Sequence, residues 1–173
     1  FETICGQRNL ANEINSLRKL GYFERGLEKS SVIERAKDEF LIFNQFYKLI
    51  EELSNKFPKK RIVFRPHPIE KKEDWEKILY DFKNVKVNNE GPISDWIANT
   101  KIVIHNGCTG GLESALRGIK TLAYIPQKMN IGGKFPNDVS IKCFKISDVI
   151  KNITNHVTNK KILENPKIKN KIK

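Results

Sequence analysis

One short segment of the chain combines two cationic side chains with two prolines. In RPHP, residues 65–68, Arg65 and His67 each precede a proline, directly after the apolar run RIVF. Proline restricts the preceding residue to an extended backbone, so both side chains are held where the apolar run ends. Arginine can donate two parallel hydrogen bonds to a phosphate, and histidine can donate one. The segment therefore predicts a phosphate contact, although two prolines that merely end a strand would produce the same pattern.

A second segment, HNGCTGGLE at residues 105–113, is rich in glycine and follows another apolar run. Thr109 is the expected N-cap of a following helix, whose free N–H groups and positive dipole would form an anion site. Glu113 could accept hydrogen bonds from ribose hydroxyls. The alternative is a tight strand-to-helix turn, and this segment alone favours neither. The candidate nucleotide-binding residues here are Asn106, Gly107, Cys108, Thr109, Gly110 and Gly111.

Other kinds of chemistry are less well supported. The chain lacks the Walker motif and the Gly-x-Gly-x-x-Gly fingerprint. A nucleophile elbow would place Thr109 where serine is needed, and Cys108 is better explained as a small buried thiol than as a nucleophile. His105 is expected in the core and His156 on the surface. No catalytic residue is assigned, and no metal site is expected.

The arrangement of apolar segments predicts the fold class. A long helix is expected at about 32–57, and short apolar strands then alternate with helices. This alternation predicts an α/β fold: a Rossmann-like parallel sheet with helices on both faces. Both glycine- or proline-rich segments would follow strands of that sheet, so we expect them at one edge. The strands are expected at residues 61–64, 85–87, 101–105 and 121–125.

The expected organisation is one domain with two flanking segments. Residues 1–33 would connect to it, residues 34–158 would form a Rossmann-like nucleotide-sugar-binding domain, and residues 159–173 would form a lysine-rich tail. The residues FETIC at the start could be the end of a strand. Because the chain begins at Phe1 and not at Met, we interpret it as a piece of a longer protein.

Composition limits the possible partners and compartment. The chain has 173 residues and a formal net charge of +12, but its lysines are scattered and no aromatic-studded basic motif is present. We therefore expect no nucleic-acid partner. Three distant cysteines without a C-x-x-C pair indicate a reducing compartment. With no long apolar run and no leader, the expected localisation is cytoplasmic.

The same motifs resemble a known family. RPHPIEKKEDW, followed by NVKVNNEGPISDWIANTKIVIHNGCTGGLESALRGIKTLAYIP, is similar to bacterial surface carbohydrate biosynthesis proteins, which resemble GT-B glycosyltransferases. The similarity extends to capsule sialyltransferases, Kdo transferases and polyol-phosphate transferases. The resemblance implies the C-terminal, donor-binding half of a GT-B architecture, acting in capsule or lipopolysaccharide synthesis.

The resemblance also implies roles for residues. His67 would contact the donor phosphate with Arg65 beside it, Thr109 and Gly110 would supply helix-start contacts, and Glu113 would bind the ribose. The donor would be a CMP- or CDP-linked sugar or polyol, with no cofactor and no metal. An N-terminal acceptor domain would be missing, so the isolated chain should bind donor without catalysing transfer.

The resemblance leaves further partners open, and two other functions compete with the one that it implies. The resemblance leaves open a lipid-linked acceptor or a peripheral contact at the inner face of the membrane. Two other functions remain open. One is the half of a nucleotide-sugar epimerase, and the other is a non-enzymatic α/β binding module with a basic surface.

Overall fold

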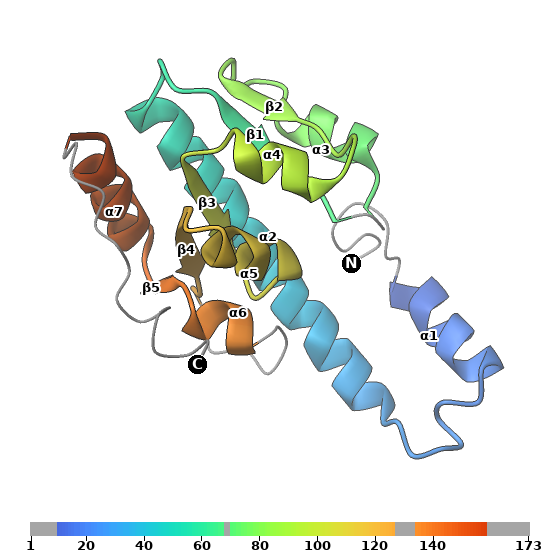
Figure 1. Ribbon diagram of the computed structural model, residues 1–173. Coiled ribbons are helices and arrows are strands. Elements are labelled where there is room, and N and C mark those ends of the chain that lie inside the picture. The colour runs from blue at the N-terminus through green and yellow to red at the C-terminus, as the bar shows by residue number, and fades with distance from the viewer. Residues whose placement is uncertain (1–9, 68–69, 127–133, 159–173) are drawn as a thin grey trace. The chain divides into compact units, whose positions relative to one another are not determined.

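The computed structural model describes residues 10–67, 70–126 and 134–158 (Figure 1). The chain divides into two compact units, Phe1–Glu90 and Gly91–Lys173. The predicted starting strand and the lysine-rich tail lie outside the described residues, so the domain boundaries proposed from the sequence remain predictions.

The first unit is a helical hairpin followed by a β–α–β motif. Its elements are α1 (Leu10–Lys19), α2 (Lys29–Lys56), β1 (Ile62–Phe64), α3 (Lys72–Ile78) and β2 (Val85–Val87). Strands β1 and β2 pair in parallel, with Val63 opposite Lys86. Helix α2 ends where the sequence predicts, because Pro58 cannot continue a helix.

Aromatic packing forms the core of the first unit. Trp75 of α3 is buried against Phe43 of α2 and Phe64 of β1, with ring centroids 5.1 and 4.3 Å apart. Asn84, just before β2, connects this strand to the segment that follows α2. Its Nδ2 donates hydrogen bonds to the carbonyl oxygens of Phe57 and Lys60, at 3.1 and 3.0 Å.

The second unit is a three-stranded parallel sheet with its helices. The strands lie in the order β3-β4-β5. Asp148 stabilises the start of the last helix, since its Oδ2 accepts hydrogen bonds from the N–H groups of Phe144 and Lys145 at 3.1 and 3.0 Å. The elements are α4 (Ile93–Ala98), β3 (Ile102–His105), α5 (Thr109–Leu116), β4 (Lys120–Tyr124), α6 (Lys134–Asp138), β5 (Ile141–Cys143) and α7 (Ile146–Thr158).

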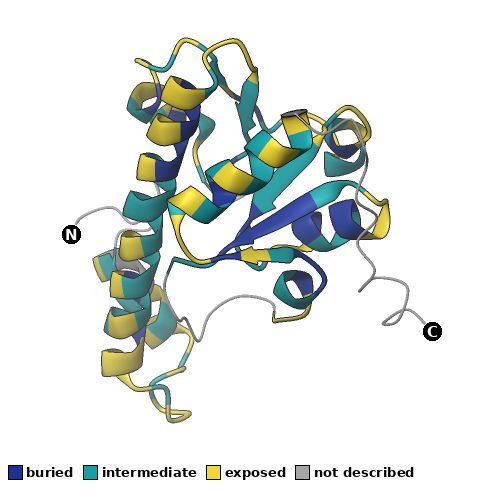
Figure 2. Cartoon of the chain, turned by 90° about the vertical axis from the view of Figure 1, so that its left-hand side faces the viewer, coloured by how far each residue is buried: buried dark blue, intermediate teal, exposed yellow. Residues whose placement is uncertain are grey.

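Strand β4 is the centre of this sheet. Residues 121–124 point alternately to its two faces, and all four are buried, as the dark blue in Figure 2 shows. Both faces of the sheet are therefore covered at β4, and helices α5 and α7 both contact this strand. Such two-sided burial is typical of parallel sheets.

The α/β class and the parallel pairing predicted from the sequence are confirmed. The structure is consistent with the predicted Rossmann-like fold, and its described strands are assigned to two small parallel sheets, β1-β2 and β3-β4-β5. Apolar runs of three to five residues predict a strand, but they do not specify which strand it pairs with. Helix α6 was missed, since its KFPND sequence reads as a loop.

Candidate functional site

Arg65 follows directly after β1, as the sequence predicts, and it is partly buried. Its Nη1 donates a hydrogen bond to the carbonyl oxygen of Glu90, 3.1 Å away. Glu90 lies just beyond the end of β2. The guanidinium therefore links the segments that follow the two parallel strands, and its position is set by the protein itself.

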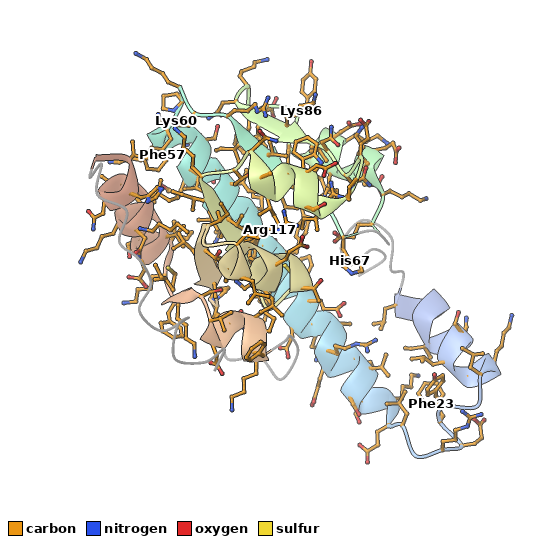
Figure 3. The ribbon with its side chains drawn as sticks, in the orientation of Figure 1. Phe23, Phe57, Lys60, His67, Lys86 and Arg117 are labelled. Carbon is orange, nitrogen blue, oxygen red and sulfur yellow. The ribbon has the colours of Figure 1, made fainter. Side chains whose placement is uncertain are left out.

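His67 is exposed in the loop after β1, where Figure 3 labels it. Its backbone N–H donates to Oε2 of Glu70 at 2.6 Å, and the N–H of Glu70 donates to the carbonyl oxygen of His67 at 2.8 Å. These reciprocal bonds fix the backbone of His67 to that of Glu70. The preceding Pro66 is buried, and His67 itself is exposed.

Residues beyond β2 complete this edge of the first unit. Asn88 is buried, and its backbone N–H donates to the carbonyl oxygen of Phe64 at 3.0 Å, which extends the pairing of β2 with β1. Lys72 at the start of α3 forms an ion pair with Glu90, with Nζ 3.5 Å from Oε1. The sequence analysis did not identify Asn88, Lys72 or Glu90 as site residues. The polar run NNE directly after a strand is the signal that could have identified Asn88 and Glu90.

The second predicted segment lies between β3 and α5, in the other unit. Helix α5 begins at Thr109 and its N-cap is Cys108, so the prediction of Thr109 as the N-cap is wrong. Cys108 has an extended backbone, and its carbonyl oxygen accepts from the N–H groups of Gly111 and Leu112. The helix therefore starts one residue earlier than a Thr109 cap would require. Cys108 is also exposed, not buried as expected, because it precedes the helix at its open end.

The two glycines of the first turn of α5 are required by packing inside the protein. A Cβ on Gly110 would come under 3.0 Å from Cδ1 of Ile93 in α4, and one on Gly111 would come under 3.0 Å from the ring of His105. Both residues are buried and have ordinary helical backbones. Only Gly107 of the predicted set needs glycine for its backbone angles, with φ of 67°. Close approach to protein side chains therefore accounts for Gly110 and Gly111.

His105 is a buried core histidine, as the sequence predicts. Its Nε2 lies 2.9 Å from Oγ of Ser140, which donates in turn to the carbonyl oxygen of Pro136 at 2.8 Å. Because the serine proton is used in that second bond, Nε2 carries the imidazole proton and Nδ1 is an acceptor. Within the part of the chain that the structure describes, Nδ1 has no partner. Burial lowers the pKa of His105 to about 4, so the ring is neutral near pH 7.

Asn106 and Gly107 are held by hydrogen bonds within the second unit. Nδ2 of Asn106 donates to the carbonyl oxygen of Tyr124 at 2.9 Å, which joins the ends of β3 and β4. The N–H of Gly107 donates to Oδ1 of Asn137 at 2.8 Å. These bonds shape the turn before α5. Sequence reasoning missed Ser140 and Asn137 because both come from segments some thirty residues away along the chain.

Glu113 lies one turn into α5 and is partly buried. Its Oε1 is 2.9 Å from Nη2 of Arg117, the C-cap residue of α5, which Figure 3 labels. Nη1 of Arg117 also donates to the carbonyl oxygen of Ser94 at 3.4 Å. A ribose that binds Glu113 would therefore meet a carboxylate already paired with a cation.

The predicted site residues thus form two groups. Arg65 and His67 belong to the first unit, and residues 106–113 belong to the second. Each group follows the carboxyl end of a parallel strand, the place where open α/β sheets bind ligands. Whether the two groups form one site remains a prediction.

Clusters of metal ligands and membrane-spanning helices are both absent from the described residues. In residues 10–67, 70–126 and 134–158, no three His, Cys, Asp or Glu side chains gather as metal ligands. In the same residues, no helix has the length and apolar character needed to cross a membrane.

Comparison with known proteins gives no relative for this chain. No protein-family model, no curated protein and no solved structure matches it. The function must therefore be argued from the residues and their positions.

Proposed function

We propose that this chain is the donor-nucleotide-binding half of a glycosyltransferase for surface polysaccharide, with a CMP- or CDP-linked sugar or polyol as donor. The proposal rests on the family resemblance of the RPHP and HNGCTGGLE segments. The observation that carries it is the position of Arg65 and His67 directly after β1 of a parallel β–α–β unit.

The chemistry of these residues suits a donor phosphate. A phosphate at the end of β1 would meet the guanidinium of Arg65 and the imidazole of His67, which supply charge-assisted or neutral hydrogen bonds. Arg65 is held at Glu90, so part of the ordering cost of binding is met before the ligand arrives. The first-turn N–H groups of α5 and the carboxylate of Glu113 would serve the nucleotide from the second unit.

The catalytic base is not assigned to this chain, because the resemblance places it in the acceptor domain. The chain's own contribution would be to bind and orient the donor and to neutralise the charge of its leaving group. It would work with a nucleotide-activated sugar and with an acceptor domain that completes the active site. A lipid-linked acceptor would bring the assembled enzyme to the inner face of the membrane.

A nucleotide panel tests the proposal directly. Thermal melting with millimolar CMP, CDP, UDP, GDP, AMP and NAD should give the largest increase with CMP or CDP. Ligand at 100 times its Kd adds about 2.7 kcal/mol to the free energy of unfolding. A larger increase with UDP or GDP would keep the transferase half and change the donor. No increase with any nucleotide would contradict donor binding by this chain.

A further inference from the structure

A groove runs between α3 and β2 in the first unit. Its volume is about 330 Å³, near the lower end of the range for small-molecule sites. Leu79, Val85 and Val87 form its apolar part. The polar residues that line it are Lys72, Glu76, Tyr80, Lys86, Asn88 and Glu90.

The charges of this groove cancel. Lys72 lies between two carboxylates, with Nζ 3.6 Å from Oε1 of Glu76 and 3.5 Å from Oε1 of Glu90. Lys86, labelled in Figure 3, is exposed on β2 and balances the second carboxylate. In a chain of net charge +12, the groove is thus locally neutral. With two charges of each sign, the lining favours neither an anion nor a cation.

Asn88 supplies a hydrogen-bond donor to the groove. Its side chain is 7% exposed, and its Oδ1 accepts from the N–H of Glu90 at 2.7 Å. No residue in the described part of the chain accepts a hydrogen bond from its Nδ2. In the described residues only Nε1 of Trp75 and Nδ1 of His105 are buried without a partner, so Nδ2 of Asn88 reaches the solvent and is open to a ligand in the groove.

Tyr80 adds a flat aromatic surface at the rim. Its side chain is 77% exposed, although large aromatic side chains are usually covered. Nζ of Lys83 lies 5.8 Å from the centroid of the ring. A tyrosine ring packs against the apolar C–H face of a ligand while its hydroxyl remains available for hydrogen bonds.

We propose that the groove between α3 and β2 binds an uncharged, polyhydroxylated ligand of the size of a single sugar ring. Hydroxyl groups both donate and accept, so they match a lining that offers carboxylate oxygens, ammonium groups and the Asn88 amide. Such a ligand adds hydrogen bonds to the existing ion pairs without breaking them. This inference does not depend on nucleotide binding by the chain.

The test uses the side-chain amide resonance of Asn88. The full chain, labelled with nitrogen-15, is titrated with glucose, galactose, N-acetylglucosamine and sorbitol, and separately with inorganic phosphate and glucosamine. We expect at least one uncharged probe to shift the Asn88 amide at millimolar concentration, and the two charged probes to shift it less. No shift with the four uncharged probes, or a stronger response to phosphate, would overturn the proposal.

Variants locate the binding surface. Asn88→Asp keeps an oxygen for the N–H of Glu90 but removes the Nδ2 donor, and its binding should be about three- to tenfold weaker. Tyr80→Ala changes an exposed ring, spares the fold and should weaken binding by a similar factor. Glu73→Gln, on an exposed residue of α3 outside the groove lining, should bind normally. If Asn88→Asp does not fold, Tyr80→Ala decides: normal sugar binding by that variant would exclude the groove.

Discussion

The ring of His105 packs against the backbone of Gly111. A Cβ added to Gly111 would lie under 3.0 Å from three atoms of the imidazole. His105 ends β3 and Gly111 lies in the first turn of α5, so this contact sets how closely the helix approaches the strand. The glycine pair that suggested a ligand-binding loop in the sequence therefore has a packing reason.

Gly111→Ala should destabilise the protein. Alanine normally stabilises a helix interior by up to about 1 kcal/mol relative to glycine, but here the new methyl group would overlap a ring held by Ser140. Overpacking of this kind costs about 1–3 kcal/mol, so the net effect is a loss. Chemical denaturation measures it. Gly110→Ala is the matched control, because its methyl meets only the tip of the Ile93 side chain, which can move. Equal stability of the two variants would contradict the packing role of Gly111.

Acid should weaken the fold through His105. Its pKa in the folded state is about 4, below the value of 6.5 for an unperturbed histidine. The unfolded chain therefore binds a proton more readily, so this stabilisation is complete above pH 6.5 and is lost as the pH falls toward 4. The loss should approach about 3 kcal/mol. Denaturation at several pH values measures the slope.

The matched control for that slope is His156, a half-buried histidine of α7. Burial also lowers the pKa of His156, with further contributions from Lys120 and Lys101, so it acts in the same direction. His105→Gln should remove most of the slope between pH 6.5 and 4, whereas His156→Gln should keep most of it. The reverse result would assign the acid sensitivity to α7.

His67→Ala should weaken nucleotide binding and spare the fold. The side chain is exposed, and a charge-assisted hydrogen bond is worth about 1.5–3 kcal/mol, or about tenfold or more in affinity. Nucleotide titration and thermal melting of the variant measure the two effects. His105→Ala should do the opposite, because it removes a buried ring and its bond to Ser140. Early melting of His67→Ala with normal binding would mean that the prolines merely end a strand.

Arg65→Ala should affect both properties. It removes a proposed phosphate contact and also the bond from Nη1 to the carbonyl oxygen of Glu90. The loss of that bond should lower the free energy of unfolding by about 1 kcal/mol. Arg65→Lys is the informative companion, since lysine keeps the charge but cannot reproduce a planar, bidentate contact. Full nucleotide affinity in Arg65→Lys would show that only charge is needed at this position.

Asn106→Ala should lower stability more than it lowers nucleotide affinity. Its Nδ2 donates to the carbonyl oxygen of Tyr124, and loss of a partly buried hydrogen bond costs about 1–3 kcal/mol. Thermal melting and nucleotide titration of the variant separate the two roles. A variant that melts normally and no longer binds nucleotide would make Asn106 a ligand-binding residue, as the sequence first suggested.

The sequence alone determined the local elements well. The period of apolar residues located α2, and VKV marked β2 at its observed bounds, because both patterns arise from neighbours along the chain. The same local signals placed RPHP and the glycine segment after strands. The buried position of His105 followed from its apolar surroundings.

Tertiary structure decided what those residues contact. Strand pairing depends on distant segments, so the division of five strands into two sheets was not predictable from periodicity. His105 contacts Ser140, which is 35 positions away along the chain, and Gly107 contacts Asn137, which is 30 positions away. A glycine in the sequence does not indicate whether a ligand or a protein side chain occupies the space beside it. Only the approach of β3 to α5 shows that, at Gly111, the neighbour is His105.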